Sequence, residues 1–376
     1  MKARTTRTGR TKPNDIRRDI GQLLIVGFEE AEPSSAVTSL LQKIQPAGVI
    51  LFARNIVSPA QTYGLLEECR KQVSEPLFTC VDMEGGRVDR FRKAIASSPS
   101  AADVFATHNR LLFRKHGRVI GQLCRAMGFN VDFAPVLDLA LEASRSVMSS
   151  RAVSADPKQV VRYAREFLLG LRSAGVIGAG KHFPGLGEAN LDTHLELPAI
   201  AKSLDRLWQE DIYPYRAMRR ELPMVLVGHA TYSAVTNDGA PASLSKKWIS
   251  EILRRKIGYR GLIVSDDLEM GGVLAAGPIE QAAVEHIRAG GDLCLICRQQ
   301  EFIERSYEAL IREAEQNSRF ALRVVESAGR VRTFKKKSAE IRHKIAIPTP
   351  ERIQKWSLMV EELSRQVRPT IPQANS

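Results

Sequence analysis

The chain has 376 residues, which suffices for two average domains or for one (β/α)8 barrel, and its 55 Lys and Arg against 42 Asp and Glu give a formal net charge of +13. Two segments carry the excess: residues 1–20 hold seven Lys or Arg against two Asp, and residues 319–344 hold nine against two Glu. Because the sequence between them is near neutral, the pattern argues against a nucleic-acid channel and favours solvated basic ends.

The chain begins with a basic segment, residues 1–14, rich in Thr and Arg, which we expect to be a disordered arm. No apolar run reaches the length of about 18 residues that spans a bilayer, and no apolar core of a secretory signal follows the arm. We therefore expect a cytoplasmic protein without stable membrane insertion. Apolar residues at helical spacing then predict a helix over 15–28.

From residue 47 onward, an apolar strand-like run is repeatedly followed by a helix-like stretch. This alternation predicts a parallel sheet with helices on both faces. The predicted strands lie at 47–52, 77–82, 130–137, 176–182, 224–229, 262–266 and 293–297, with a weaker eighth at 197–200. The helices between them are predicted at 59–71, 109–127, 157–173, 203–220, 245–256, 279–289 and 301–315.

The last of these strands contains Cys294 and Cys297, whose spacing is also found in metal sites. Residues three apart in a strand point to opposite faces, so we interpret both as buried thiols. The other three cysteines are scattered, and an odd total of five argues against a disulfide framework.

The predicted strands end in ionisable residues, namely Asp82, Asp138, Lys181, His182, His229, Asp266 and Asp267. In a barrel these ends meet at one rim, where the catalytic groups of that fold sit, whereas an open doubly wound sheet would spread them along an edge. We therefore predict an α/β fold with a single (β/α)8 TIM-like barrel over 15–340, and keep the open sheet as the alternative. A C-terminal extension, 341–376, is predicted to hold one amphipathic helix over 353–367 and a tail.

The densest chemistry follows the strand at 176–182. Lys181 and His182 stand where this strand ends, and a loop rich in Gly and Pro then carries Asp192 and His194. A histidine titrates near neutral pH, and an Asp two residues away can fix its tautomer, so the pair has the composition of a general acid/base with its orienting partner.

Five motifs resemble, in order and spacing, those of the β-N-acetylglucosaminidases of glycoside hydrolase family 3. They are Val81-Asp-Met-Glu-Gly-Gly-Arg-Val-Asp-Arg90, Phe133-Ala-Pro-Val-Leu-Asp138, Lys181-His-Phe-Pro-Gly-Leu-Gly187, Asp192-Thr-His194 and Val264-Ser-Asp-Asp-Leu-Glu-Met270. The resemblance spans roughly residues 15–340. It implies a single-barrel retaining exo-enzyme that forms a covalent glycosyl intermediate, removes terminal N-acetylglucosamine from a glycan or muropeptide of peptidoglycan, and uses no metal and no cofactor.

The resemblance assigns the catalytic roles. The nucleophile falls on Asp266, and the acid/base dyad falls on Asp192 and His194. The structural alternative is that Asp266 and Asp267 cap the following helix, a role that we expect of Asp267. Glu84 and Glu269 are the alternative acid/base carboxylates.

The remaining rim residues suit a sugar ring. By resemblance, Asp82 would accept hydrogen bonds from ring hydroxyls. Donors to the sugar would be Arg90, Arg151, Lys181 and His182. His229 would either line the subsite or serve as a core histidine with both ring nitrogens satisfied.

The chain departs from the family pattern at Leu186, where a second His is common, and at Met83 and Asp89, where Gln is common. These departures leave substrate identity less defined than reaction class. The alternatives within the family are a phosphorylase and a β-glucosidase or xylosidase. Outside it, they are a non-catalytic sugar-binding barrel and a Schiff-base aldolase built on Lys181. The aglycone and the oligomeric state stay open.

Overall fold

The computed structural model describes residues 13–189, 197–342 and 345–368, and in this part eight parallel strands close into a barrel in sequence order. The last strand pairs with the first, with Leu295 opposite Ile25. This closure confirms the predicted (β/α)8 TIM-like barrel and excludes the open sheet. The strands are β1 (Leu24–Val26), β2 (Gly48–Ile50), β3 (Phe78–Val81), β4 (Val131–Asp132), β5 (Ile177–Phe183), β6 (Met224–Val227), β7 (Leu262–Asp267) and β8 (Leu293–Ile296).

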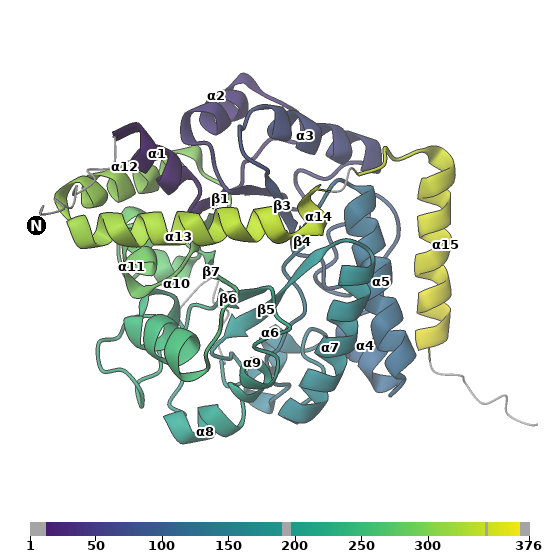
Figure 1. The fold of residues 1–376 in the computed structure, drawn as a ribbon. Coiled ribbons are helices and arrows are strands. Elements are labelled where there is room, and N and C mark those ends of the chain that lie inside the picture. Colours follow the sequence, from purple (N-terminus) through teal and green to yellow (C-terminus); the bar gives the residue numbers. More distant parts are fainter. Residues whose placement is uncertain (1–12, 190–196, 343–344, 369–376) are drawn as a thin grey trace, which may run out of the picture.

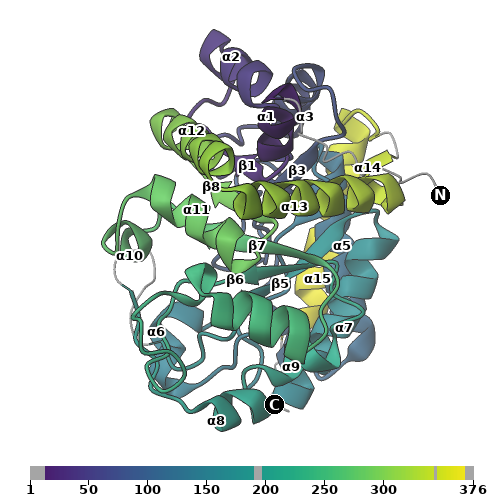
Figure 2. The same ribbon diagram turned by 60° about the vertical axis from the view of Figure 1, so that its left-hand side comes forward.

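Helices connect the strands and surround the barrel (Figure 1 and Figure 2). The α-helices are α1 (Pro13–Gly21), α2 (Ser35–Ile44), α3 (Pro59–Lys71), α4 (Ala101–Ala106), α5 (Arg110–Ala126), α6 (Arg145–Met148), α7 (Pro157–Ser173), α8 (Leu204–Gln209), α9 (Tyr213–Ala217), α10 (Gly271–Leu274), α11 (Ile279–Ala289), α12 (Gln300–Gln316), α13 (Ser318–Lys337), α14 (Ala339–Arg342) and α15 (Pro350–Val367). Two 3-10 turns, η1 (Glu142–Ser144) and η2 (Ala242–Leu244), and a π-helix, η3 (Lys247–Lys256), complete the described elements.

The bounds of α3, α7 and α11 are those predicted from the sequence. α7 shows why such bounds can be predicted. The Asp156 side chain accepts a hydrogen bond from the backbone N–H of Lys158, and Pro157 fills the first turn. Both are standard signals for a helix start.

The predicted eighth strand at 197–200 is wrong. β1 completes the barrel instead, and it lies inside the segment 15–28 that was predicted to be all helix. All three residues of β1 are buried, so apolar residues occupy both of its faces and imitate helical spacing. Residues 197–200 lie beyond the end of β6, where Ala199 forms an isolated bridge with Thr231.

Two predicted helices take another form, and the prediction omits the short helices α4, α6, α10 and α14 as well as two longer ones. Segment 203–220 folds as α8 and α9, because Pro214 at the start of α9 cannot donate the hydrogen bond that a continuous helix needs. Segment 245–256 becomes the π-helix η3. The prediction omits α2, and it omits α13, whose many basic residues interrupt the apolar pattern.

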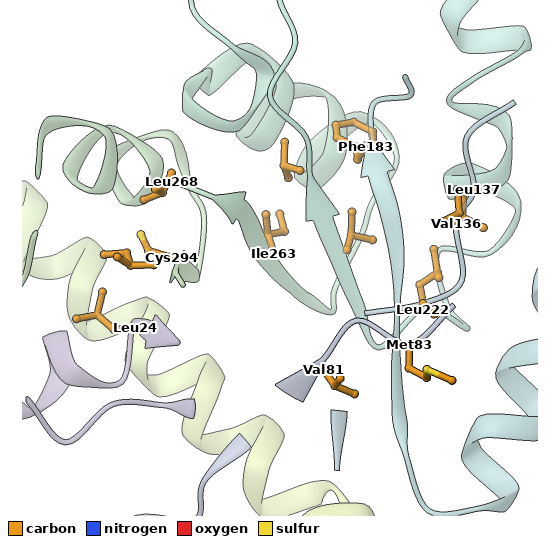
Figure 3. Close-up of a cluster of buried hydrophobic side chains, with 14 of the residues drawn as sticks. Leu24, Val81, Met83, Val136, Leu137, Phe183, Leu222, Ile263, Leu268 and Cys294 are labelled. Atoms are coloured by element: carbon orange, nitrogen blue, oxygen red, sulfur yellow. The ribbon is translucent and has the colours of Figure 1, made fainter. Parts of the chain in front are cut away.

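The core has two layers, one inside the barrel and one between strands and helices. Along β7, Leu262 and Val264 point inward, whereas Ile263 packs in the outer layer. Figure 3 shows part of the outer layer, including Leu24 and Cys294 from neighbouring strands. The two thiols of the last strand are buried in different layers, Cys294 outside and Cys297 inside, as predicted.

The long helix α13 lies across the end of the barrel at which the strands begin (Figure 1). Val331 packs with the interior layer, and the Phe334 ring stacks edge-on against Phe78 of β3 at 6.0 Å. The end at which the strands finish is not crossed by α13 (Figure 1).

The predicted C-terminal helix is present as α15, which starts earlier than expected, at Pro350, and packs against α5 through Val360 and Leu363. Figure 1 shows it beside α5 at the edge of the molecule. Residues 1–12 of the predicted arm lie outside the described part. No helix within the described residues is long and apolar enough to cross a bilayer.

Candidate active site

The carboxyl ends of the strands surround a hollow of about 750 Å³, its open mouth included, which is a size typical of small-ligand sites. The wall contains six residues that the sequence placed in the site: Asp82, Arg90, Arg151, Lys181, His182 and Asp266. Of the seven ionisable residues predicted to meet at one rim, five line this hollow and two, Asp138 and His229, do not. Asp192 and His194 lie outside the described residues, so the dyad stays a prediction.

A buried cluster of charges forms one side of the hollow. The Lys181 ammonium on β5 lies 2.7 Å from Asp82 Oδ1 and 2.6 Å from Glu84 Oε1. Arg151 donates two hydrogen bonds of 2.8 Å to the carboxylate of Glu84. A bidentate guanidinium and carboxylate pair fixes both planes, so this cluster is rigid before any ligand binds.

Glu84 is the hub of that cluster. Burial is the largest influence and by itself would raise the pKa of Glu84, but the charges of Arg151 and Lys181 outweigh it and hold the pKa well below its usual value. The carboxylate has no proton to donate near neutral pH. This argues against Glu84 as the alternative catalytic acid.

Asp266 stands near the end of β7 with its side chain partly exposed in the hollow. The backbone N–H of Asp267 donates to its Oδ1 at 2.9 Å. Burial would raise the pKa of Asp266, but the nearby rings of His182 and His229 and this backbone hydrogen bond lower it overall. Asp266 is therefore a carboxylate at neutral pH, which is the form that a nucleophile requires.

His182 is held by a buried carboxylate that follows β4. Its Nδ1 lies 2.6 Å from Oδ2 of Asp138, and its backbone N–H donates to the same oxygen at 3.2 Å. The other oxygen of Asp138 accepts the backbone N–H of Leu186 at 2.8 Å. Since Nδ1 is occupied, Nε2 is the ring nitrogen that a ligand can use.

The family described as "Glycosyl hydrolase family 3 N terminal domain" matches residues 15–334. The chain belongs to glycoside hydrolase family 3. It is 37% identical to a β-hexosaminidase of Alkalilimnicola ehrlichii over 287 residues, which are 74% of this chain and 82% of that protein. A β-hexosaminidase of Thiobacillus denitrificans is 38% identical over 68% of this chain and 73% of its own length.

Solved structures agree with the family. A family 3 β-N-acetylglucosaminidase from a Paenibacillus species superposes with a TM-score of 0.85 at 29% identity, over 93% of this chain and 68% of that one. The chain is thus a glycoside hydrolase, and the aldolase and the non-catalytic barrel lose their support.

His229 does not reach the hollow of this family 3 enzyme. It is fully buried, its Nδ1 lies 2.7 Å from the Ser243 hydroxyl, and its Nε2 lies 2.9 Å from the backbone oxygen of Asp267. Burial lowers the pKa of His229. Both ring nitrogens are satisfied, so the geometry favours the core-histidine interpretation, in which His229 fixes the end of β7 beside Asp266.

Two carboxylates next to Asp266, those of Asp267 and Glu269, accept hydrogen bonds from nearby backbone N–H groups. Asp267 Oδ1 accepts the backbone N–H of Glu269 at 3.0 Å, so it stabilises the turn before α10 rather than capping that helix, whose N-cap is Met270. Glu269 accepts the backbone N–H groups of Arg298 and Gln299 at 2.6 and 3.0 Å, just before α12. Burial raises the pKa of Glu269, but its side chain does not line the hollow, which argues against Glu269 as the catalytic acid.

Arg90 lines the hollow and has a buried donor that is not satisfied within the described protein. Its guanidinium lies 5.5 Å from the centre of the Phe52 ring, and its buried Nε has no hydrogen-bond partner among the described residues. Phe52 also lines the hollow, and Arg54 lies against its ring at 4.8 Å. A cation stacked on a ring keeps its N–H groups in one plane, directed at whatever fills the site.

The departures from the family pattern fall mostly outside the hollow. Met83 is buried in the outer core layer, and Asp89 accepts the backbone N–H groups of Phe91 and Ser98 within a turn. Leu186 alone of the three lines the hollow, where it adds an apolar wall.

Sequence reasoning did not include Asp138 among the site residues. It named Glu84 only as an alternative acid. The available signal for Asp138 was its position at a strand end, the same signal that identified Lys181. For Glu84 no sequence signal gives the pairing, because Arg151 is 67 positions away.

Proposed function

We propose that this family 3 enzyme is a retaining exo-β-N-acetylglucosaminidase that releases terminal N-acetylglucosamine from peptidoglycan fragments. The observation that carries the proposal is Asp266, an ionised and partly exposed carboxylate facing a hollow lined by fixed donors. The matched relatives named β-hexosaminidase support the reaction class.

In the first step, a carboxylate oxygen of Asp266 attacks the anomeric carbon while the bond from that carbon to the leaving oxygen breaks. The leaving oxygen takes a proton from the acid, and the sugar becomes an ester of Asp266. In the second step, the residue that donated the proton acts as base and takes a proton from water. The water oxygen then replaces the carboxylate of Asp266 at the anomeric carbon. Two displacements return the original anomeric configuration.

We assign the proton transfers to His194, with Asp192 as its orienting partner. The flanks of that segment support the assignment. Leu186 is fixed to Asp138 beside β5, and the chain re-enters beside β6, where the N–H of Thr231 donates to the oxygen of Pro198 at 2.9 Å. Both flanks thus lie on the rim that carries Asp266.

The hollow suits one sugar residue. Its inner part is formed by interior side chains of the barrel, including Ile50, Phe133, Leu226 and Leu295, which stop a glycan from passing through. We assign to Asp82 the role of acceptor for ring hydroxyls, and the donor roles to Arg90, Arg151, Lys181 and His182. A site closed on one side accepts a chain end, which is what exo cleavage of a terminal sugar requires.

The test is hydrolysis of an aryl β-N-acetylglucosaminide by the wild type and by Asp266→Ala. We expect a loss of about 10³-fold or more in kcat for the variant, since removing a nucleophile leaves only binding and electrostatic stabilisation. Added azide should restore turnover and yield the α-configured glycosyl azide, because azide can enter the space left by the carboxylate. A wild-type rate equal to that of Asp266→Ala would refute the proposal.

The same assay distinguishes the other candidates. Aryl β-glucoside and β-xyloside should be poor substrates. Incubation in phosphate buffer should release free sugar, and formation of the sugar 1-phosphate instead would replace hydrolysis by phosphorolysis.

A further inference from the structure

The described part of the barrel has a second hollow, of about 1030 Å³ with its open mouth included, far from the rim that carries Asp266. It lies at the end where the strands begin. Its wall combines the first residues of β5, the residue before β6, the outer side of α7 and the last turns of α13. The proposed reaction uses none of these residues.

This hollow exists because α13 covers only part of the barrel end that it crosses (Figure 1). Arg330 binds Asp292 before β8 at 3.1 Å, and the ammonium of Lys335 donates to Gln22 before β1 at 2.8 Å. The helix ends two residues later, at Lys337. Beyond Lys337, Ser338 and Glu340 complete the wall of the hollow beside the beginning of β5 and the residue before β6.

The lining of this hollow is partly apolar. It includes the half-buried ring of Phe334 together with Leu168, Val176 and Ile177, all three of which are buried by the fold. Such a surface can hold the aromatic or alkyl part of a ligand by excluding water.

Cations without partners surround this apolar surface. Arg172, Arg220 and Lys337 are exposed and line the hollow, and their side chains make no hydrogen bond or ion pair with any described residue. A fourth cation, Arg165, is neutralised by Glu221 through contacts of 2.6 and 2.8 Å. Glu340 also lines the hollow, but three cations exceed its single negative charge. An anion placed among these cations therefore lowers their energy.

We propose that this hollow is a second ligand site, which binds a small amphipathic anion. Its carboxylate, sulfonate or phosphate group contacts Arg172, Arg220 and Lys337, and its aromatic or alkyl part lies on Phe334 and Ile177. The site is independent of the proposed hydrolysis, since the two hollows share no residue.

The probe for this site is anilinonaphthalene sulfonate, which combines an anionic group with an aromatic body and fluoresces when it leaves water. We expect saturable binding of one probe per chain to the folded wild type. The substitutions Arg172→Gln, Arg220→Gln and Lys337→Gln should each weaken binding about fivefold, which corresponds to about 1 kcal/mol. Raising the salt concentration to about 1 M should weaken wild-type binding because it screens the charges.

Lys336→Gln is the matched control. Lys336 is exposed on the same turn of α13 but does not line the hollow, so its substitution removes the same charge from the chain. Equal weakening by Lys336→Gln and Lys337→Gln would overturn the proposal, and so would displacement of the probe by N-acetylglucosamine or the absence of saturable binding. If a variant fails to fold, as judged by circular dichroism, the salt dependence and the sugar competition with wild-type chain still decide.

Discussion

Substitution of Asp138 by Asn isolates the role of the buried carboxylate behind His182. The single oxygen of the new amide can keep the hydrogen bond from the Leu186 N–H, which is 2.8 Å long in the wild type. The amide NH₂ then faces His182 Nδ1, which lies 2.6 Å from the present oxygen, and also the backbone N–H of His182. The ring must move its proton to Nε2 or turn away from the hollow.

The cost follows from the type of bond that is lost. Hydrogen bonds to charged groups contribute about 1.5–3 kcal/mol. If about 2–3 kcal/mol of this acts in the transition state, kcat/KM for an aryl β-N-acetylglucosaminide falls about 30- to 160-fold. Stability should fall as well, since two buried donors would face each other.

Asp292→Asn is the matched control, because Asp292 is equally buried and charge-paired but lies at the opposite end of the barrel, where it accepts the N–H of Ile263 at 2.9 Å. Urea unfolding should show a loss of stability for both variants, whereas kcat/KM at a temperature where both are folded should fall only for Asp138→Asn. Equal activity of the two variants would refute the role given to Asp138.

Three further predictions concern stability. Glu84→Gln leaves two buried cations, Arg151 and Lys181, without their shared anion, so we expect the free energy of unfolding in urea to fall by about 3–5 kcal/mol. A loss below about 1 kcal/mol would contradict the central role of Glu84 in the charge cluster. Burial raises the pKa of Asp267 to about 7, so the native state keeps a proton that the unfolded state loses, and stability should decline as the pH rises from about 4 to about 7. Asp267→Asn should make the free energy of unfolding less dependent on pH over this range. An unchanged slope of that free energy against pH would argue against a raised pKa for Asp267. Leu363→Ala should loosen α15 by about 2–5 kcal/mol, seen as faster hydrogen exchange of that helix, whereas Leu358→Ala, at a position 57% exposed on the same helix, should not.

The barrel could be predicted because its signals are local. Buried parallel strands read as apolar runs, and helices such as α7 carry their own start signals in Asp156 and Pro157. β1 could not be predicted in the same way, since three buried residues after a helix have no period that separates strand from helix. Its identity depends on pairing with β2 and β8, which are far away in sequence.

For the site, too, features with local sequence signals could be predicted, and features set by contacts between distant residues could not. The sequence could bring Lys181, His182 and Asp266 to one rim, because strand ends meet there in every barrel of this kind. It could not show that Glu84 is neutralised by Arg151 or that both nitrogens of His229 are occupied. These properties arise from side-chain contacts between different strands and loops, and they decide which carboxylates remain for catalysis.

The central claim is that the sugar becomes bound to Asp266. The direct measurement uses a fluorinated N-acetylglucosaminyl fluoride that forms the intermediate quickly and releases it slowly, followed by intact-mass and peptide mass spectrometry. We predict an added mass of one glycosyl group per chain, located on the peptide that contains Asp266 and absent from Asp266→Ala. A label on another residue, or continued turnover of the reagent without any labelled enzyme, would contradict the account.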